Sequence, residues 1–89
     1  MKKITYLELR KFVLRRLLDE HRFGQKQMLL DNVVKFAREN QKEAKAVLNK
    51  LIEQNIVLCK KKHYGVHVWL NMKRFDEIKQ IIETEDDRV

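Results

Sequence analysis

Residues 40–54, NQKEAKAVLNKLIEQ, decide the fold that the sequence predicts. Asn40 followed three residues later by Glu43 matches the capping-box signature of a helix start, so we expect a helix from Gln41 to Gln54. Apolar side chains recur along it at spacings of three and four residues and form one stripe, made of Ala44, Val47, Leu48, Leu51 and Ile52. The opposite face is small, basic and rich in hydrogen-bonding groups, and consists of Lys42, Lys45, Ala46 and Asn49. Such a face suits a helix that lies in the major groove of DNA, and a merely solvated face has the same pattern.

The chain has 89 residues, which is enough for one domain with one modest core. Lys and Arg number 20 against 13 Asp and Glu, so the formal net charge is +7 and the surface should attract polyanions such as nucleic acids. Cys59 is the only cysteine, which excludes an internal disulfide and favours a reducing, cytoplasmic setting, at the nucleoid if the protein binds DNA. No apolar run approaches the ~20 residues of a membrane span.

The first helix is expected from Tyr6 to His21, because Thr5 and Glu8 form a second capping box. Its apolar residues cover more of the circumference than the ~100° stripe that one core contact needs. We therefore expect a homodimer joined through the first and last helices. The predicted interface residues are Leu7, Arg10, Leu14, Phe75, Ile78 and Ile82.

Gly24 suits a left-handed position after the first helix. Residues 28–30 form an apolar run that periodicity assigns equally to a short buried strand or to the opening turn of a helix. Asp31 is a good N-cap, which favours a short strand followed by a helix over 32–39. This helix would meet the helix at 41–54 after a very short link around Asn40. Two helices joined so tightly cross at a steep angle, which is the helix-turn-helix geometry.

After residue 54, Asn55 suits a left-handed helix end, and strands are expected over 56–60 and 66–70 with a basic turn at 61–65 between them. Asn71 should cap a last helix over 72–83. The predicted organisation is one domain over 1–83, followed by an acidic, disordered tail at 84–89.

For two side chains of the expected hairpin, Trp69 and Cys59, the sequence pattern allows more than one position in the fold. Trp69 should point away from Val66, Val68 and Leu70, and we expect it to pack under the first helix in preference to an interface. Cys59 is expected to be a small residue of the core or of the hairpin.

The order helix, short strand, helix, helix, two-stranded hairpin, helix resembles a winged helix-turn-helix domain, an α+β and mostly helical fold. The stretch AVLNKLIEQNIVLCKKK, residues 46–62, is similar to the recognition helix and first wing strand of MarR-like and ArsR-like regulators, with Leu48, Leu51 and Ile56 at the family's apolar positions. Many relatives have Gly where this chain has Asn55. Small winged-helix proteins of archaea and their viruses are similar in size.

This resemblance implies a transcriptional regulator that binds double-stranded DNA. The recognition helix would lie in the major groove, and the wing at 60–65 would follow the backbone or enter the minor groove, with Tyr64 stacking on sugar or packing beneath the tip. The implied DNA-binding residues are Gln41, Lys42, Lys45, Asn49, Lys35, Lys60, Lys61, Lys62, His63 and Tyr64. The alternative function is a winged helix that serves as a protein-interaction module in a larger assembly.

Cys59, His63 and His67 have a spacing that invites a metal site, but the paired C-x-x-C pattern of common zinc modules is absent, so no metal is expected. No nucleophile stands with a base in a recognisable context, and no glycine-rich phosphate loop is present. We therefore expect no enzyme activity, no catalytic residues and no cofactor.

Overall fold

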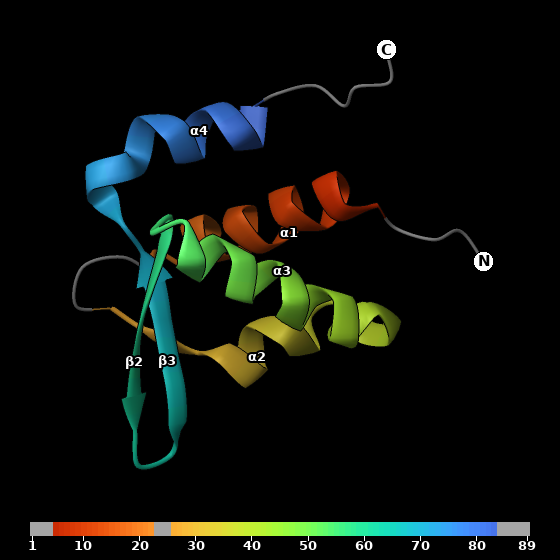
Figure 1. The fold of residues 1–89 in the computed structure, drawn as a ribbon, viewed down its shortest axis with the longest axis vertical. Coiled ribbons are helices and arrows are strands. Elements are labelled where there is room, and N and C mark those ends of the chain that lie inside the picture. The colour runs from red at the N-terminus through yellow and green to blue at the C-terminus, as the bar shows by residue number, and fades with distance from the viewer. Residues whose placement is uncertain (1–4, 23–25, 84–89) are drawn as a thin grey trace.

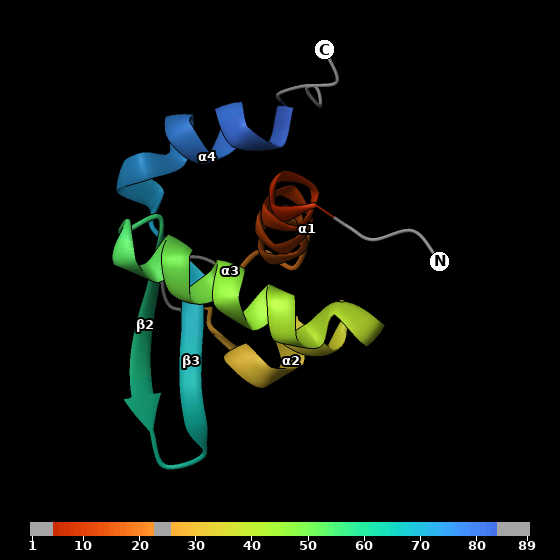
Figure 2. The same ribbon diagram turned by 45° about the vertical axis from the view of Figure 1, so that its right-hand side comes forward.

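The computed structural model describes residues 5–22 and 26–83, which form a mostly helical α+β fold with one three-stranded antiparallel sheet. Three helices, α1 to α3, pack beside the sheet, and the β2–β3 hairpin projects away from them (Figure 1). Helix α4 lies at the end opposite the hairpin tip (Figures 1 and 2). The coarse fold class predicted from the sequence is confirmed. The expectations for Gly24 and for the tail at 84–89 lie outside the described residues.

Helix α1 spans Tyr6–Asp19 and begins with the predicted capping box. The hydroxyl of Thr5 accepts a hydrogen bond from the backbone N–H of Glu8 at 3.1 Å, and the Glu8 carboxylate accepts one from the N–H of Thr5 at 2.9 Å. The helix ends two residues before the expected His21, because His21 itself takes the left-handed conformation with φ 56°. The N–H of Arg22 then donates to the carbonyl of Leu17 at 2.8 Å and closes the helix end.

The wide apolar arc of α1 is covered within the chain. Leu9, Val13, Leu14 and Leu17 are buried, and α1 contacts α2, α3, α4 and β3. The excess apolar surface that suggested a second subunit therefore has partners inside one protomer, so it no longer requires a dimer. The homodimer stays a prediction.

Strand β1 is only Met28–Leu29, and helix α2 follows directly as Leu30–Lys35. The predicted N-cap role of Asp31 is wrong, because the helix starts at Leu30, two residues before the expected Asn32, and its N-cap is Leu29, which makes no side-chain cap. Asp31 lies in the first turn instead, where a carboxylate interacts favourably with the helix dipole.

The connection between α2 and α3 is longer than the sequence suggested. Arg38 is left-handed at φ 54°, and a 3₁₀ turn, η1, covers Arg38–Asn40 before α3 begins. Helix α3 spans Gln41–Glu53, so its predicted start is confirmed. Asn40 occupies the N-cap position without a side-chain hydrogen bond, because its backbone, at φ −102° and ψ 27°, is not in the extended conformation that side-chain capping needs.

The predicted apolar stripe of α3 is confirmed as part of the core. Ala44, Val47, Leu48 and Leu51 are buried, and Ile52 packs against the core from its edge. Asn55 is left-handed at φ 63°, as expected, and the N–H of Ile56 donates to the carbonyl of Leu51 at 3.0 Å.

Strands β2, Val57–Lys62, and β3, Gly65–Leu70, pair in a hairpin, and the sheet order is β1-β3-β2. The turn contains only His63 and Tyr64, whereas the sequence predicted a turn over 61–65, because Lys61 and Lys62 still pair with Val66 and Gly65. Gly65 has φ 133°, which other residues adopt only with strain.

The register places alternate residues of the hairpin on opposite faces of the sheet. Val68 and Leu70 are buried on the inner face. Leu58 and Trp69, which pair with each other, share the outer face and are half-buried. Trp69 is not among the side chains packed against the core, so the expected packing under α1 is not observed.

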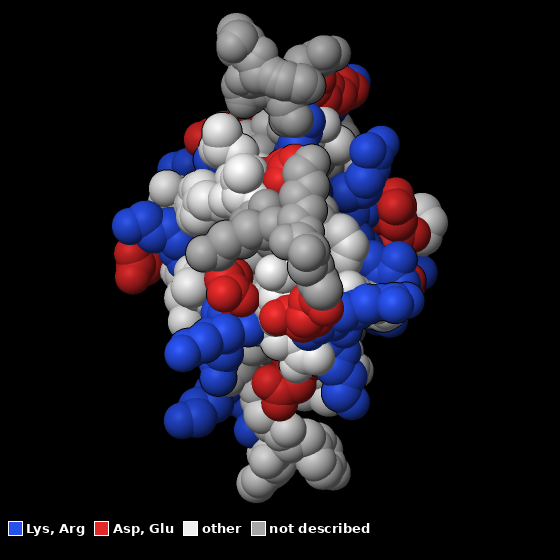
Figure 3. Space-filling model, turned by 90° about the vertical axis from the view of Figure 1, so that its right-hand side faces the viewer, with Lys and Arg blue, Asp and Glu red and all other residues white. Residues whose placement is uncertain are grey.

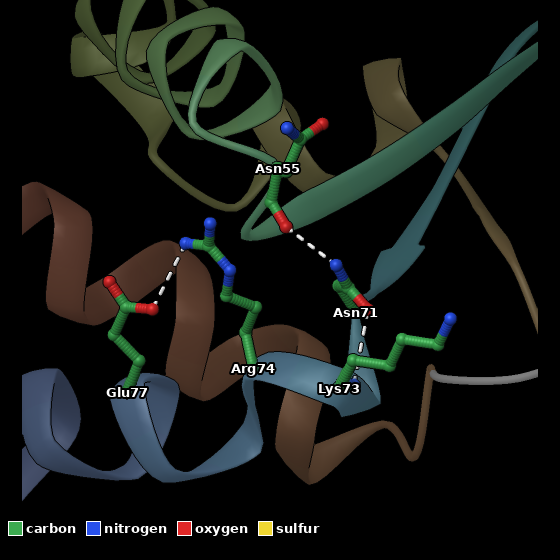
Figure 4. Close-up of polar contacts among 5 residues, drawn as sticks. All are labelled: Asn55, Asn71, Lys73, Arg74 and Glu77. Atoms are coloured by element: carbon green, nitrogen blue, oxygen red, sulfur yellow. Dashed lines mark hydrogen bonds and ion pairs between the residues drawn. The ribbon is translucent and has the colours of Figure 1, made fainter.

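The end of the chain is arranged by Asn71, at the junction of β3, α3 and α4 (Figure 4). Its side chain accepts a hydrogen bond from the N–H of Lys73 at 3.1 Å, so the predicted cap is confirmed. The first turn is a 3₁₀ helix, η2, over Met72–Arg74, and α4 spans Phe75–Glu83.

Candidate nucleic-acid interface

The outward face of α3 is a continuous polar surface. Burial of the apolar stripe on one side of the helix leaves the opposite side in solvent. The predicted residues of this face are all exposed, namely Gln41, Lys42, Lys45, Ala46 and Asn49. None of these side chains takes part in a hydrogen bond or ion pair recorded among the described residues. Their polar groups are therefore available to a ligand.

Further cations flank the beginning of α3. Lys35 is exposed in the last turn of α2, as predicted, and Arg38 is exposed on the connection. Sequence reasoning missed Arg38, because its placement depends on a left-handed residue that no local pattern signals. Lys50, in the last turn of α3, is an exposed cation that was also not predicted.

Acidic groups limit the basic surface at one end. Glu39 and Glu43 are exposed at the start of α3. Figure 3, which views the end where α1 and α3 begin, shows acidic side chains along the middle of that face and basic ones on both flanks. Positive charge is therefore not uniform over the molecule, and this end has a mixed surface.

The hairpin carries a second group of cations. Lys60, Lys61 and Lys62 are all exposed, but their side chains do not form one row. Lys60 and Lys62 share the outer face of the sheet, whereas Lys61 lies on the inner face, because successive strand residues alternate. The ammonium of Lys62 donates to the side-chain oxygen of Gln27 at 2.9 Å, which ties the hairpin to the segment before β1.

The turn of the hairpin places two aromatic rings at its tip. The rings of His63 and Tyr64 meet edge to face, with centroids 6.5 Å apart. Tyr64 is 86% exposed, so the alternative in which it packs beneath the tip is wrong. The hairpin extends beyond α3 on the side where α2 lies (Figures 1 and 2).

The base of the hairpin is tied to the end of α3. The side-chain amide of Asn71 donates to the backbone carbonyl of Asn55 at 2.8 Å, and the N–H of Asn71 donates to the carbonyl of Ile56 at 3.0 Å (Figure 4). Arg74 and Glu77 form an ion pair at 3.0 Å beside this junction, with both side chains well exposed. The two hydrogen bonds of Asn71 connect the C-terminal end of α3 to the base of the hairpin. The link through Asn55 could not be read from the sequence, since it joins residues 16 positions apart.

The residues whose spacing invited a metal site, although none was expected, do not converge. Cys59 and His67 lie on opposite faces of the hairpin, because Cys59 pairs with Val68 and His67 pairs with Lys60. Cys59 is exposed, which places it on the hairpin and excludes the core position. Within the described residues, no group of three or more His, Cys, Asp or Glu side chains is positioned to hold a metal ion.

The residues predicted for a dimer interface fall into two groups. Leu14 and Ile78 are fully buried in the chain's own core, so as placed they cannot touch a second copy. Leu7 is 46% exposed on α1, while Arg10, Phe75 and Ile82 are half-buried near the surface. The guanidinium of Arg10 lies 5.9 Å from the ring centroid of Tyr6 within the same chain.

Comparisons with known proteins identify no relative of this chain. No protein-family model matches the chain, and no curated protein sequence or solved structure matches it significantly. Among the described helices, none combines the length and apolar character needed to cross a membrane.

Proposed function

We propose that this chain is a winged-helix protein that binds double-stranded DNA and regulates transcription, with α3 in the major groove and the β2–β3 hairpin on the backbone or in the minor groove. The observation that supports the proposal is the outward face of α3, where two lysines and two amide side chains are exposed and have no hydrogen-bond or ion-pair partner among residues 5–22 and 26–83. A helix is about 10–12 Å across with its side chains, which suits a groove about 12 Å wide.

Each side chain of this face has a role that follows from its chemistry. Asn49 carries an amide that can pair with adenine through two hydrogen bonds. Lys42 and Lys45 can donate to guanine or neutralise phosphates, and Gln41 lies at the helix start, where contacts to the backbone are common. Lys35 and the hairpin lysines would add phosphate contacts.

A salt series measured by fluorescence anisotropy on mixed-sequence duplex DNA tests the proposal. If about six phosphates are neutralised, the log-log slope of affinity against salt is about −5. We expect the triple variant Lys42→Ala/Lys45→Ala/Asn49→Ala to bind more weakly, with a slope reduced in magnitude by about 2, because two cations are lost.

The matched control is Lys73→Ala/Lys79→Ala, which removes the same charge from exposed positions next to and within α4. It should leave the slope unchanged. Equal losses of affinity in the two variants would mean that only net charge matters and would refute base recognition by α3. Weak DNA binding with the same affinity in wild type and both variants would favour the alternative, a protein-interaction module.

A further inference from the structure

Tyr64 is far more exposed than the other large hydrophobic side chains of the described residues. It shows 86% of its surface to solvent, whereas the other large hydrophobic side chains classed as exposed among the described residues show at most 46%. A phenol ring in water forgoes the free energy it would gain on burial. Its position at the hairpin tip therefore contributes little to folding and is suited to a contact outside the chain.

The tip holds this ring in a defined place. Pairing of Lys62 with Gly65 closes the turn, and His63 stands against Tyr64 with an angle of 66° between the ring planes. Lys61, Lys62, His63, Tyr64 and His67 line one shallow concavity. The tip forms the far end of the molecule in both ribbon views, away from every helix (Figures 1 and 2).

The residues around the Tyr64 ring are basic, which favours an anionic ligand. Three consecutive lysines, Lys60 to Lys62, precede the turn, and no acidic residue lies between Gln54 and Asn71. A basic strand next to an accessible aromatic ring is the combination with which proteins bind unpaired nucleic acid, through phosphate contacts and base stacking. A bare apolar surface would use the ring but not the lysines.

We propose that Tyr64 is a stacking site for an unpaired nucleobase. In a duplex each base is stacked on both sides, at about 3.4 Å per step along a strand, and offers only its edges to the grooves. A base can therefore stack on the flat face of Tyr64 only where it has left the duplex stack, as at a bulge or in a single strand. This inference rests on the proposed function for its duplex contacts and adds a preference for DNA that carries an unpaired base.

The test uses two short duplexes of the same sequence, one fully paired and one with a single bulged 2-aminopurine. Affinity is measured by anisotropy, and stacking by quenching of 2-aminopurine fluorescence, excited where protein does not absorb. The variants are Tyr64→Ala, which removes the ring, and Tyr64→Phe, which keeps it. The matched control is Tyr6→Ala, which removes an exposed tyrosine from α1, remote from the hairpin tip.

Wild type and Tyr64→Phe should bind the bulged duplex about tenfold more tightly than the paired one, as expected for one stacked base at about 1.4 kcal/mol, and should quench the 2-aminopurine. Tyr64→Ala should lose both the preference for the bulged duplex and the quenching, and Tyr6→Ala should behave as wild type. Equal affinity of wild type for both duplexes, or quenching that survives Tyr64→Ala, would overturn the inference.

The inference and the proposed function fail in different ways. Loss of duplex affinity in the α3 triple variant, without any effect of Tyr64→Ala on the bulged duplex, refutes the stacking site alone. Binding of the bulged duplex that depends on Tyr64, with no binding of the paired duplex, supports the stacking site and refutes the groove-reading helix. Absence of binding to both duplexes refutes both.

Discussion

Replacement of Asn71 by Ala should destabilise the protein by about 1–2 kcal/mol. The substitution removes the cap on the N–H of Lys73, which contributes typically about 1 kcal/mol, and the hydrogen bond at 2.8 Å to the carbonyl of Asn55, which contributes about 0.5–1.5 kcal/mol. Both bonds lie near the surface, so the lower part of each range applies. For a domain of this size, each kcal/mol lowers the melting temperature by about 4–8 °C.

Thermal and urea unfolding, followed by circular dichroism, measure this loss of stability. A second variant separates the contributions of the two hydrogen bonds. Asn71→Asp keeps an oxygen that can cap Lys73 but replaces the donor to Asn55 with a carboxylate, so its stability should fall between those of wild type and Asn71→Ala. The matched control is Asn49→Ala, which removes an exposed amide without hydrogen bonds and should change stability by less than about 0.5 kcal/mol.

The reasoning about this junction is refuted if Asn71→Ala is no less stable than Asn49→Ala. It is refuted in part if Asn71→Asp equals wild type, because the bond between Asn71 and Asn55 would then contribute nothing. Asn71→Ala should weaken the proposed DNA binding only as far as it increases the unfolded fraction, since Asn71 is not on the outward face of α3.

Two further predictions concern the core and the hairpin. Leu14→Ala should cost about 2–5 kcal/mol in the free energy of unfolding, because the side chain is fully buried, while Leu7→Ala at 46% exposure should cost less than about 1 kcal/mol; comparable costs in urea unfolding would contradict the assignment of Leu14 to the core. Gly65→Ala should cost about 1–3 kcal/mol through its φ of 133°, with an added contact to Leu29 at 3.4 Å, and unchanged stability would show that the hairpin turn relaxes without cost.

The helices could be predicted from the sequence where the signal is local. The capping box of Thr5 and Glu8 involves four consecutive residues, and the stripe of α3 repeats with the period of the helix itself. Asn55 was also predictable, because a left-handed helix end depends on the conformational tolerance of one residue type. The lysines and Asn49 on the outward face of α3 follow from the same periodicity.

The errors arose where a neighbour in space decides the local conformation. Asn40 has the residue type of a cap but stands in a 3₁₀ turn. The apolar run at 28–30 is divided between two elements, because Met28 and Leu29 pair with β3 while Leu30 already begins α2. The hairpin strands extend through Lys61 and Lys62 because their backbone groups pair across the sheet, against the low strand preference of lysine. The arc of α1 was assigned to a dimer because the sequence does not show that α4 returns to cover it.

The sequence by itself determined which faces of α1 and α3 are apolar, where Asn55 and Asn71 end and begin helices, and the basic character of the surface, because these depend on neighbours within a few residues. Only the tertiary structure decided that Leu14 and Ile78 are core residues, that Cys59 and His67 diverge, and that Tyr64 stands free at the tip. The physical reason is that burial and strand register depend on contacts between segments far apart in the chain, and no local pattern of residues encodes those contacts alone.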